Sequence, residues 1–313
     1  MAIRKPSEMD FQSKGIVLIL YGAPGVGKTT LALSAPKPVL IDTDNGIARV
    51  APQHRKDTSS ARSYTEIMAD IEEAATSGQY ETCVVDTIGA LLDAMTLHLT
   101  AEDPKLAQKD GTLSLKGYGA LKQLFLTFSN TVRAKFKNTV FVLHETSDRD
   151  NDGNPTYSVI AAGSAKTLLW QPADLAGRVF MDGNKRYIGF TPTEQYYAKG
   201  AYGIRGLYEI PDLSDGAKNN YLEVLFSSVR TTLINEKLQG DEDQIKYNNA
   251  MQIGLAFVEA IEKPEDVQVA LDNFKGIKHC LTSDAELKAA LKRKMSELSI
   301  VYNRSSKAYE FKQ

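Results

Sequence analysis

The sequence predicts an α/β fold in which a mostly parallel β-sheet has helices on both faces. Two observations predict it. Apolar runs without polar alternation recur between helix-forming segments, as in "KPVLID", "TCVVD" and "TVFVLH", and such runs are typical of parallel strands that are buried on both faces. The first apolar run, "GIVLILYG", leads directly into a glycine-rich turn and a helix-forming stretch, which is the setting of a P-loop. We therefore predict a P-loop domain over residues 1–212.

The glycine-rich turn is the most specific motif in the chain. Gly22, Gly27, Lys28 and Thr29 match the pattern G-x-x-x-x-G-K-[ST], whose glycines let backbone N–H groups point inward at a phosphate. The helix that follows adds its positive N-terminal end. The alternative is an ordinary turn with an incidental lysine. We predict that ATP binds to nine consecutive residues, which are Gly22, Ala23, Pro24, Gly25, Val26, Gly27, Lys28, Thr29 and Thr30.

Three side chains are expected to act on the phosphates and on a bound Mg²⁺. Lys28 is predicted to reach the β- and γ-phosphates, and the hydroxyl of Thr29 is predicted to enter the Mg²⁺ shell. Asp86 ends the apolar run "TCVVD", so it lies at the carboxyl edge of the sheet, where it can hold a water of that shell. The alternative for Asp86 is an N-cap of the following helix.

Glu66 is the candidate that orients or deprotonates the attacking water, a task that hydrolysis requires. Thr87 follows Asp86, so the Asp-Glu pair of many motor ATPases is missing. Glu66 lies at the start of the helix after the second strand. However, Ser63-x-x-Glu66 is also a capping box, and the residues alone leave both roles open.

His144 ends the apolar run "VFVLH", which places it beside the expected γ-phosphate. We predict that it senses the phosphate state and passes that state to the segment that follows. The alternative is a structural histidine held by hydrogen bonds.

Two long segments of the first domain, residues 100–117 and 147–163, are predicted to lack regular structure. Long loops in compact domains are often functional. The stretch "RVFMDGNKRYIGF" predicts a β-hairpin around an Asp-Gly turn at the edge of the sheet. Residues 213–313 form a predicted C-terminal helical region, which binds DNA or a partner, with helix ends at Lys263-Pro264 and at Gly276.

Composition limits the classes of function. The 313 residues include 37 Lys and Arg against 39 Asp and Glu, so a nucleic-acid surface has to be a local patch. Cys83 and Cys280 are expected to be reduced thiols, and no zinc-type spacing occurs. No apolar run approaches the roughly 20 residues of a membrane span, and the N-terminus lacks a signal peptide. We therefore expect a cytoplasmic protein that does not contact membranes.

The order of these motifs resembles the RecA-like ATPase core in the short form found in phage P-loop proteins. The segments that carry the resemblance are "YGAPGVGKTT", "VLIDTDNG", "VVDTIGAL", "KGYGALKQLF" and "VFVLHET", and they span about residues 14–212. Some proteins of that family are RecA-like single-strand annealing proteins. The resemblance implies a Mg²⁺-dependent ATPase in the cytoplasm of a bacterial host, encoded by a phage or prophage. It also implies a homo-oligomer, a ring or filament with nucleotide between subunits, that acts on single-stranded DNA in recombination or replication.

The resemblance also assigns roles to residues. It implies that Glu66 is the catalytic glutamate and that His144 stands for a glutamine that senses the γ-phosphate. Segments 100–117 and 147–163 fall where RecA-like proteins carry DNA-binding loops. The stretch "YYAKGAYGIRG" resembles a segment whose lysines reach a neighbouring subunit's nucleotide, which implies that role for Lys199 and, less directly, for Arg205. Solvated surface charges are the alternative for both.

Some features depart from that pattern. The second of these DNA loops begins with three acids, Asp148, Asp150 and Asp152, which is unfavourable for holding phosphates. A basic surface is expected instead at Lys185 and Arg186, or in residues 288–313, which carry seven basic and two acidic residues. A solvated helix face is the alternative for that run.

Two other functions compete with the one that the resemblance implies. One is an ATPase motor or loader that acts on a protein partner such as a helicase, with the C-terminal helices as the docking module. The other is a small-molecule kinase, which needs an arginine-bearing lid. Residues 100–117 contain no arginine and residues 147–163 contain only Arg149, which disfavours the kinase.

Overall fold

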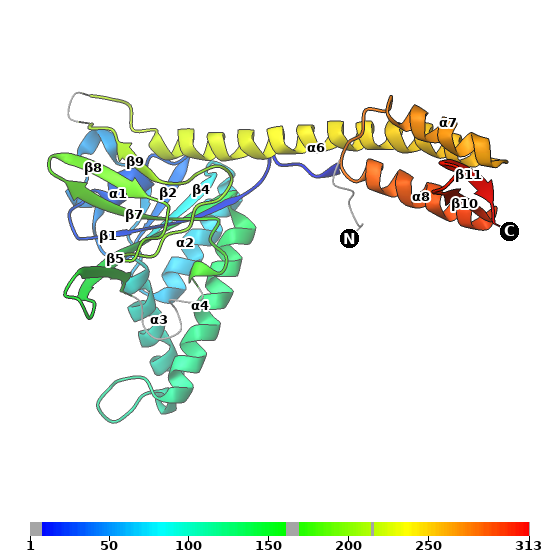
Figure 1. Ribbon diagram of the computed structural model, residues 1–313. Coiled ribbons are helices and arrows are strands. Elements are labelled where there is room, and N and C mark those ends of the chain that lie inside the picture. The colour runs from blue at the N-terminus through cyan, green and yellow to red at the C-terminus, as the bar shows by residue number, and fades with distance from the viewer. Residues whose placement is uncertain (1–7, 161–168, 214–215, 313) are drawn as a thin grey trace. The chain divides into compact units, whose positions relative to one another are not determined.

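The computed structural model (Figure 1) describes residues 8–160, 169–213 and 216–312. The chain divides into two compact units. Of the described residues, those between 10 and 232 form one unit, and residues 233–312 together with residues 8 and 9 form the other. The sequence-based boundary after residue 212 stays a prediction.

A mostly parallel sheet forms the centre of the first unit. Its strand order is β3-β2-β4-β5-β1-β7-β8-β9, with β6 paired to β5 beside this path. The strands are β1 (Ile16–Gly22), β2 (Pro38–Asp42), β3 (Thr58–Ser59), β4 (Thr82–Asp86), β5 (Asn138–Arg149), β6 (Pro155–Val159), β7 (Leu175–Asp182), β8 (Lys185–Gly189) and β9 (Leu207–Ile210). Neighbours from β3 to β7 run parallel, whereas β6, β8 and β9 pair antiparallel. This sheet confirms the predicted α/β fold.

Helices cover both faces of this sheet, which explains why its strands lack polar alternation. On one face lie α2 (Tyr64–Ser77), α3 (Ile88–Glu102) and α4 (Leu115–Lys135); on the other lie α1 (Lys28–Ala32) and the first turns of α6 (Tyr221–Glu259) (Figure 1). Ile19 of β1 packs in one cluster with Ile67, Leu91 and Phe125. Leu18, the preceding residue of the strand, points to the opposite face and is equally buried.

The segment 147–163 is not an irregular loop, so that prediction is wrong for its described part. β5 continues beyond His144 to Arg149, and β6 pairs with it antiparallel from Glu145 opposite Val159 to Arg149 opposite Pro155. Polar residues are compatible with strand here because the β5–β6 extension is largely solvent-accessible. Residues 161–163 lie outside the described residues.

Segment 100–117 is partly helical. α3 continues to Glu102, a short 3₁₀ helix spans Pro104–Leu106, and α4 begins at Leu115. Between these helices the chain closes on itself through a bridge between Ala107 and Leu113. Two further 3₁₀ turns, Ile47–Arg49 and Pro52–His54, follow β2. The expected edge hairpin is β7–β8, with Gly183 at φ 58° in its two-residue turn.

The second unit is a small helical assembly with a hairpin. It contains the later part of α6, α7 (Pro264–Phe274), α8 (Ser283–Glu297) and the antiparallel strands β10 (Ile300–Asn303) and β11 (Ala308–Phe311). Side chains from these elements share one core, including Val258, Val267, Phe274, Leu287 and Ile300. The ends of α7 match the helix ends predicted at Lys263-Pro264 and near Gly276, whereas the hairpin was not predicted.

In the parts of the chain that the structure describes, every helix is too short or too polar to cross a lipid bilayer.

Candidate active site

The P-loop joins β1 to α1 in a conformation that needs its glycines. A Cβ at Gly22 would collide with the main-chain oxygen of Val179 on β7, so only glycine lets these strands approach as they do. Gly25 and Gly27 have φ values of 81° and 85°, in the left-handed region that glycine enters without steric cost. The turn therefore follows the geometry that its sequence predicts.

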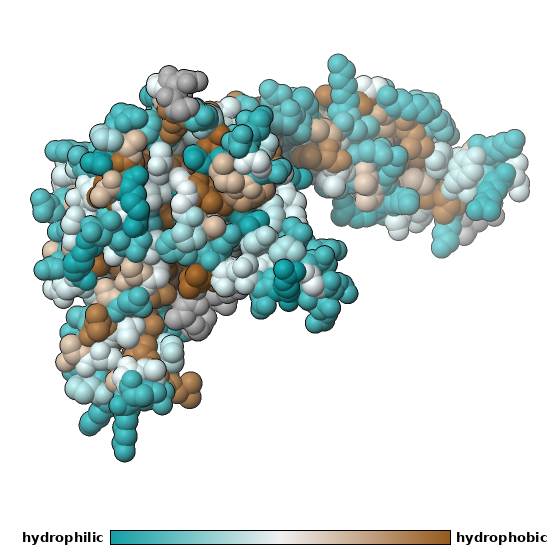
Figure 2. Space-filling view, turned by 90° about the vertical axis from the view of Figure 1, so that its left-hand side faces the viewer, coloured by the Kyte–Doolittle hydropathy of each residue, from teal (hydrophilic) through white to brown (hydrophobic). Residues whose placement is uncertain are grey.

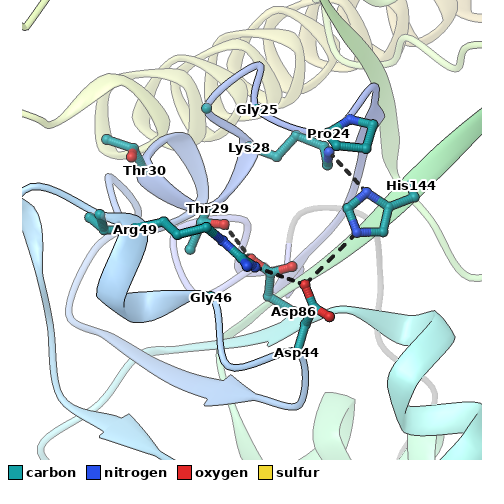
Figure 3. Close-up of a pocket in the computed structure, with 12 residues that line it drawn as sticks. Pro24, Gly25, Lys28, Thr29, Thr30, Asp44, Gly46, Arg49, Asp86 and His144 are labelled. Atoms are coloured by element: carbon teal, nitrogen blue, oxygen red, sulfur yellow. Dashed lines mark hydrogen bonds and ion pairs between the residues drawn. The ribbon is translucent and has the colours of Figure 1, made fainter.

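A cavity of about 360 Å³ lies over the P-loop (Figure 3). Six of its lining residues belong to the loop and α1, namely Pro24, Gly25, Gly27, Lys28, Thr29 and Thr30. The others come from β4, β5 and the turn after β2, namely Asp44, Gly46, Arg49, Val50, Asp86 and His144. Separate segments of the sequence thus meet around one volume of the size of a small-molecule site.

Lys28 is buried at the floor of this cavity. Its Nζ donates to the main-chain oxygens of Gly22 at 2.9 Å and Ala23 at 2.8 Å. A third contact, at 3.4 Å, joins Nζ to Nδ1 of His144. Burial lowers the pKa of Lys28, and the charge of Asp86 acts in the opposite direction. The ammonium group is therefore held within the protein by acceptors at the inner side of the loop.

His144 lies between Lys28 and the carboxylate of Asp44. A lysine ammonium can only donate, so Nδ1 of His144 accepts and its ring proton resides on Nε2. Nε2 lies 4.0 Å from Oδ2 of Asp44. Burial, followed by the charge of Lys28, lowers the pKa of His144, so the ring is neutral at pH 7. This arrangement places a neutral donor beside the cavity.

Thr29 and Asp86 meet at the opposite side of the cavity. The Thr29 hydroxyl donates to Oδ2 of Asp86 at 2.6 Å. Burial raises the pKa of Asp86 to about 6, although this hydrogen bond and the charge of Lys28 act against the rise. Thr87, not Asp86, caps α3, because its side chain accepts from the backbone N–H of Ala90. The structure therefore excludes the alternative that Asp86 is an N-cap.

The pair suits Mg²⁺ as a cofactor. Hydroxyl and carboxylate oxygens are ligands that this ion prefers, and it is usually held by one or two such groups together with phosphates and water. A buried carboxylate whose pKa is raised by desolvation gains an electrostatic partner when a cation binds beside it. Thr29 and Asp86 are thus the residues that would hold Mg²⁺.

Asp44 is a site residue that the sequence interpretation missed. The neighbouring Asp42, which lies opposite Asp86 in the sheet register, folds the chain back by accepting N–H bonds from Gly46 and Ile47. This turn directs the Asp44 carboxylate into the cavity, where Nη2 of Arg49 lies 2.9 Å from Oδ2 (Figure 3). The signal was the acidic pair at the end of "VLIDTD", next to the strand that ends in Asp86.

Glu66 does not line this cavity. Its Oε2 accepts from the backbone N–H of Ser63 at 3.1 Å and of Arg62 at 3.3 Å, and Oγ of Ser63 accepts from the Glu66 N–H at 3.2 Å. These hydrogen bonds lower the pKa of Glu66. Of the two roles that the residues left open, the structure shows the capping box. A catalytic role for Glu66 stays a prediction.

Lys199 and Arg205 also lie away from the cavity walls. The backbone of Lys199 exchanges hydrogen bonds with Ala176 of β7, and its ammonium donates to the carbonyl of Ala173. Arg205 is exposed, and its backbone N–H donates to the hydroxyl of Tyr208. A role of either residue at a neighbouring subunit's nucleotide stays a prediction.

An ion pair connects the cavity strand to the β5–β6 hairpin. Glu145, the residue after His144, accepts two hydrogen bonds from Arg178, at 2.8 Å and 3.1 Å. Both side chains are buried, with exposed fractions of 8% and 9%. The Arg178 guanidinium also lies 3.5 Å from the ring centroid of Tyr157 on β6. Arg178 of β7 thus contacts both β5, one residue after His144, and β6 of the hairpin.

A family model described as an AAA domain matches residues 14–202. This range contains the P-loop and every residue that lines the cavity above it. The chain belongs to this AAA domain family. The AAA domain supports ATP binding and hydrolysis by a P-loop site, whereas the RecA-like phage resemblance remains a prediction. A comparison with curated proteins finds none that matches the chain.

Proposed function

We propose that this AAA domain hydrolyses ATP in a Mg²⁺-dependent reaction and uses the energy on single-stranded DNA. The observation that carries the hydrolysis part is the cavity of Figure 3, in which Lys28, Thr29, Asp86, Asp44 and His144 face one volume. It combines a cation for phosphates, oxygen ligands for a metal and a further carboxylate that opens into the cavity, which are the parts that phosphoryl transfer to water requires.

Each residue has a task that follows from its contacts. Lys28 exchanges its carbonyl acceptors for β- and γ-phosphate oxygens and stabilises the charge that develops there. Thr29 and Asp86 would hold Mg²⁺, which would neutralise phosphate charge when bound.

Asp44 orients the attacking water and accepts its proton, because its carboxylate lines the cavity whereas that of Glu66 does not. Arg49 is paired with Oδ2 of Asp44, so the water is assigned to Oδ1. His144 is neutral, and its Nε2, 4.0 Å from the Asp44 carboxylate, can donate to a phosphate oxygen or a water in the cavity.

Paired carboxylate-to-amide variants test the assignment. In Asp44→Asn, ATP should still bind and turnover should fall by roughly 10²-fold or more, the scale of general-base catalysis. Glu66→Gln is the matched comparison, because it makes the same chemical change at the other candidate carboxylate. A large loss of turnover in Glu66→Gln with normal turnover in Asp44→Asn would assign the base to Glu66 instead. Lys28→Ala should abolish ATP-dependent turnover in a folded protein, and normal hydrolysis there would contradict the whole site.

The surface of the second unit supports single-stranded DNA as the substrate that the ATPase acts on. On the β10–β11 hairpin, Tyr302 and Phe311 are 50% and 55% exposed. The basic residues Arg304, Lys307 and Lys312 lie in or directly beside the same hairpin. Aromatic side chains that stack with bases, set among cations that hold the backbone, are the usual design of sequence-tolerant single-strand binding.

Fluorescence anisotropy with a labelled oligonucleotide, at two salt concentrations, tests this. We expect binding that weakens steeply with salt and strengthens with a non-hydrolysable ATP analogue. Tyr302→Ala with Arg304→Gln should weaken it at least about 10-fold, since one stacked base alone contributes about 1–3 kcal/mol. Removal of residues beyond 285 is a poor test, since Leu287 and Leu291 of α8 are buried in the core of the unit.

A homo-oligomer with nucleotide between subunits is part of the proposal, since it gives Lys199 access to a neighbour's phosphates. The molar mass of the protein in solution, measured with and without the ATP analogue, tests the predicted oligomer. A monomer in both states would contradict it.

Exposed apolar side chains favour a second candidate function, an ATPase loader that acts on a protein partner. Ile253, Val269 and Leu281 of the second unit are more than half exposed. The face shown in Figure 2 likewise has apolar residues scattered among hydrophilic ones. No detectable oligonucleotide binding at low salt, in either nucleotide state, would favour this candidate over the DNA-acting ATPase.

A further inference from the structure

A second cavity, of about 190 Å³, lies beside the P-loop helix α1. Thr30 lines both this cavity and the one over the P-loop. Its other lining residues come from α1, β8, the end of β9, the connection between β9 and α6, and the first turn of α6. The shared residue makes the two cavities neighbours along one edge of α1.

Hydrogen bonds fix the far wall of this cavity to the P-loop helix. The Asn219 side-chain amide donates to the carbonyl of Thr30 at 2.8 Å. At the start of α6, the backbone N–H groups of Leu222 and Glu223 donate to Oγ and O of Ser34, at 2.9 Å and 3.0 Å. The wall therefore keeps its position relative to the residues that surround the first cavity.

Arg186 stands between the two cavities with an unused donor. Its guanidinium lies against the P-loop, because a Cβ on Gly27 would come within 2.9 Å of Cζ. Its Nε is buried and has no hydrogen-bond partner among the described residues. By contrast, Lys185, the preceding residue, turns outward and pairs with Glu209 at 2.8 Å. A buried donor without an acceptor is rare in native proteins and requires an explanation.

We propose that the second cavity receives the nucleobase and ribose of the bound nucleoside triphosphate, and that Arg186 donates to the phosphate next to the ribose. The proposal rests on the ATP site proposed above. A ligand whose phosphates lie on the P-loop reaches the second cavity across Thr30. There, Leu31, Ile210 and Pro211 form an apolar wall for a flat ring.

The chemistry of the remaining lining residues fits a nucleobase. Tyr221 supplies an aromatic face, and the amides of Asn219 and Asn220 supply donors and acceptors for a base edge. Small-molecule sites combine apolar walls with a few such polar groups. The negative phosphate also supplies the acceptor that the Arg186 Nε lacks.

The first test fills the cavity at its mouth. Val224 lines it and is 59% exposed, so Val224→Trp adds bulk with little effect on the core. Val269→Trp is the matched control, because Val269 is also 59% exposed and lies on α7. Calorimetric titration with Mg²⁺-ATP and with Mg²⁺-tripolyphosphate should show a loss of ATP affinity of about 10-fold or more in Val224→Trp and no loss in Val269→Trp, since the added ring blocks the apolar surface that the nucleobase would bury. Tripolyphosphate binding should not change.

The second test removes the charged donor. Arg186→Gln should weaken both ATP and tripolyphosphate about 10- to 100-fold, the scale of one hydrogen bond to a charged group. Arg133→Gln, at an exposed arginine of α4, is its control. Normal affinity of Arg186→Gln for both ligands would overturn the role of Arg186. In Val224→Trp, an unchanged ATP affinity or an equal loss for ATP and tripolyphosphate would overturn the nucleobase assignment.

These outcomes separate the inference from the proposed function. Suppose that the unaltered protein binds both ligands and that Lys28→Ala loses this binding. If Val224→Trp and Arg186→Gln then bind normally, only this inference is overturned. No binding of either ligand by the unaltered protein would overturn the ATP site, and the inference with it.

Discussion

Replacement of Asp86 by Asn should make the protein inactive and more stable. Burial raises the pKa of Asp86 from 3.8 to about 6, so the folded state disfavours the ionised carboxylate at neutral pH. At about 1.36 kcal/mol per pKa unit, this rise corresponds to about 3 kcal/mol. The amide of the variant would keep an oxygen that accepts from the Thr29 hydroxyl, while the charge that is costly to bury is gone.

The sign of the pH dependence follows from linkage. Between the unfolded pKa of 3.8 and the folded pKa of about 6, the folded state holds a proton on Asp86 that the unfolded state has lost, so stability falls as the pH rises through this window. Asp86→Asn should therefore be more stable than the unaltered protein by about 3 kcal/mol at neutral or slightly alkaline pH. The gain should be clearly smaller in the middle of the window.

Urea denaturation in EDTA, without nucleotide, measures both differences. The single tryptophan, Trp170, is a suitable probe, since it contacts Tyr21 and Tyr197 in the unit that contains the site. Equal or lower stability of Asp86→Asn at neutral pH would refute the reasoning. The same variant should lose Mg²⁺-dependent hydrolysis, because a neutral amide is a weaker partner for the metal shell.

Predictions for four further substitutions concern folding and stability. Arg178→Ala should destabilise the first unit by about 3–5 kcal/mol, because it leaves Glu145 buried without its partner, and Arg178→Met combined with Glu145→Leu should recover most of the loss in the same urea assay. Gly22→Ala should prevent normal packing of β1 on β7 and abolish soluble expression. Gly25→Ala, which meets no atom within 4 Å, should cost only about 1–2 kcal/mol for its left-handed backbone. Ser63→Ala should lower the stability by about 1 kcal/mol through loss of the cap and leave ATP affinity unchanged.

The central sheet and the P-loop could be predicted because their signals are local. Buried parallel strands show as unbroken apolar runs, and the P-loop has its required residues within one turn. Asp86 could be placed for the same reason, since a carboxylate at the end of such a strand lies at the edge where ligands bind.

The position of Asp44 in the cavity could not be predicted from the sequence. Asp44 follows a strand and Glu66 begins a helix, and the hydrogen bonds that orient each carboxylate come from the fold of the chain around it. Asp44 turns inward because Asp42 holds the following turn by two backbone N–H groups. The Glu66 carboxylate accepts hydrogen bonds from the backbone N–H groups of Ser63 and Arg62. The spacing of Ser63 and Glu66 had left this capping box open as one of two roles.

Strands that are short or solvent-accessible were harder to recognise. Polar residues such as Thr146 and Asp148 argue against a strand only if that strand is buried. The β5–β6 extension is largely solvent-accessible, so polar residues are compatible with strand there. The hairpin of β10 and β11 was missed because its two strands are four residues each, too short for a reliable alternation pattern.

The hydrogen bonds of Lys28 have a consequence for binding kinetics. Its ammonium has three N–H groups, and Gly22, Ala23 and His144 supply an acceptor for each. The dehydration of this ammonium therefore takes place when the chain folds rather than when a phosphate arrives. A phosphate that binds to Lys28, as the proposed function requires, would exchange one set of acceptors for another, and His144 would lose its donor in the same step. Arrival of the ligand and release of the β5 side chain would then be one event.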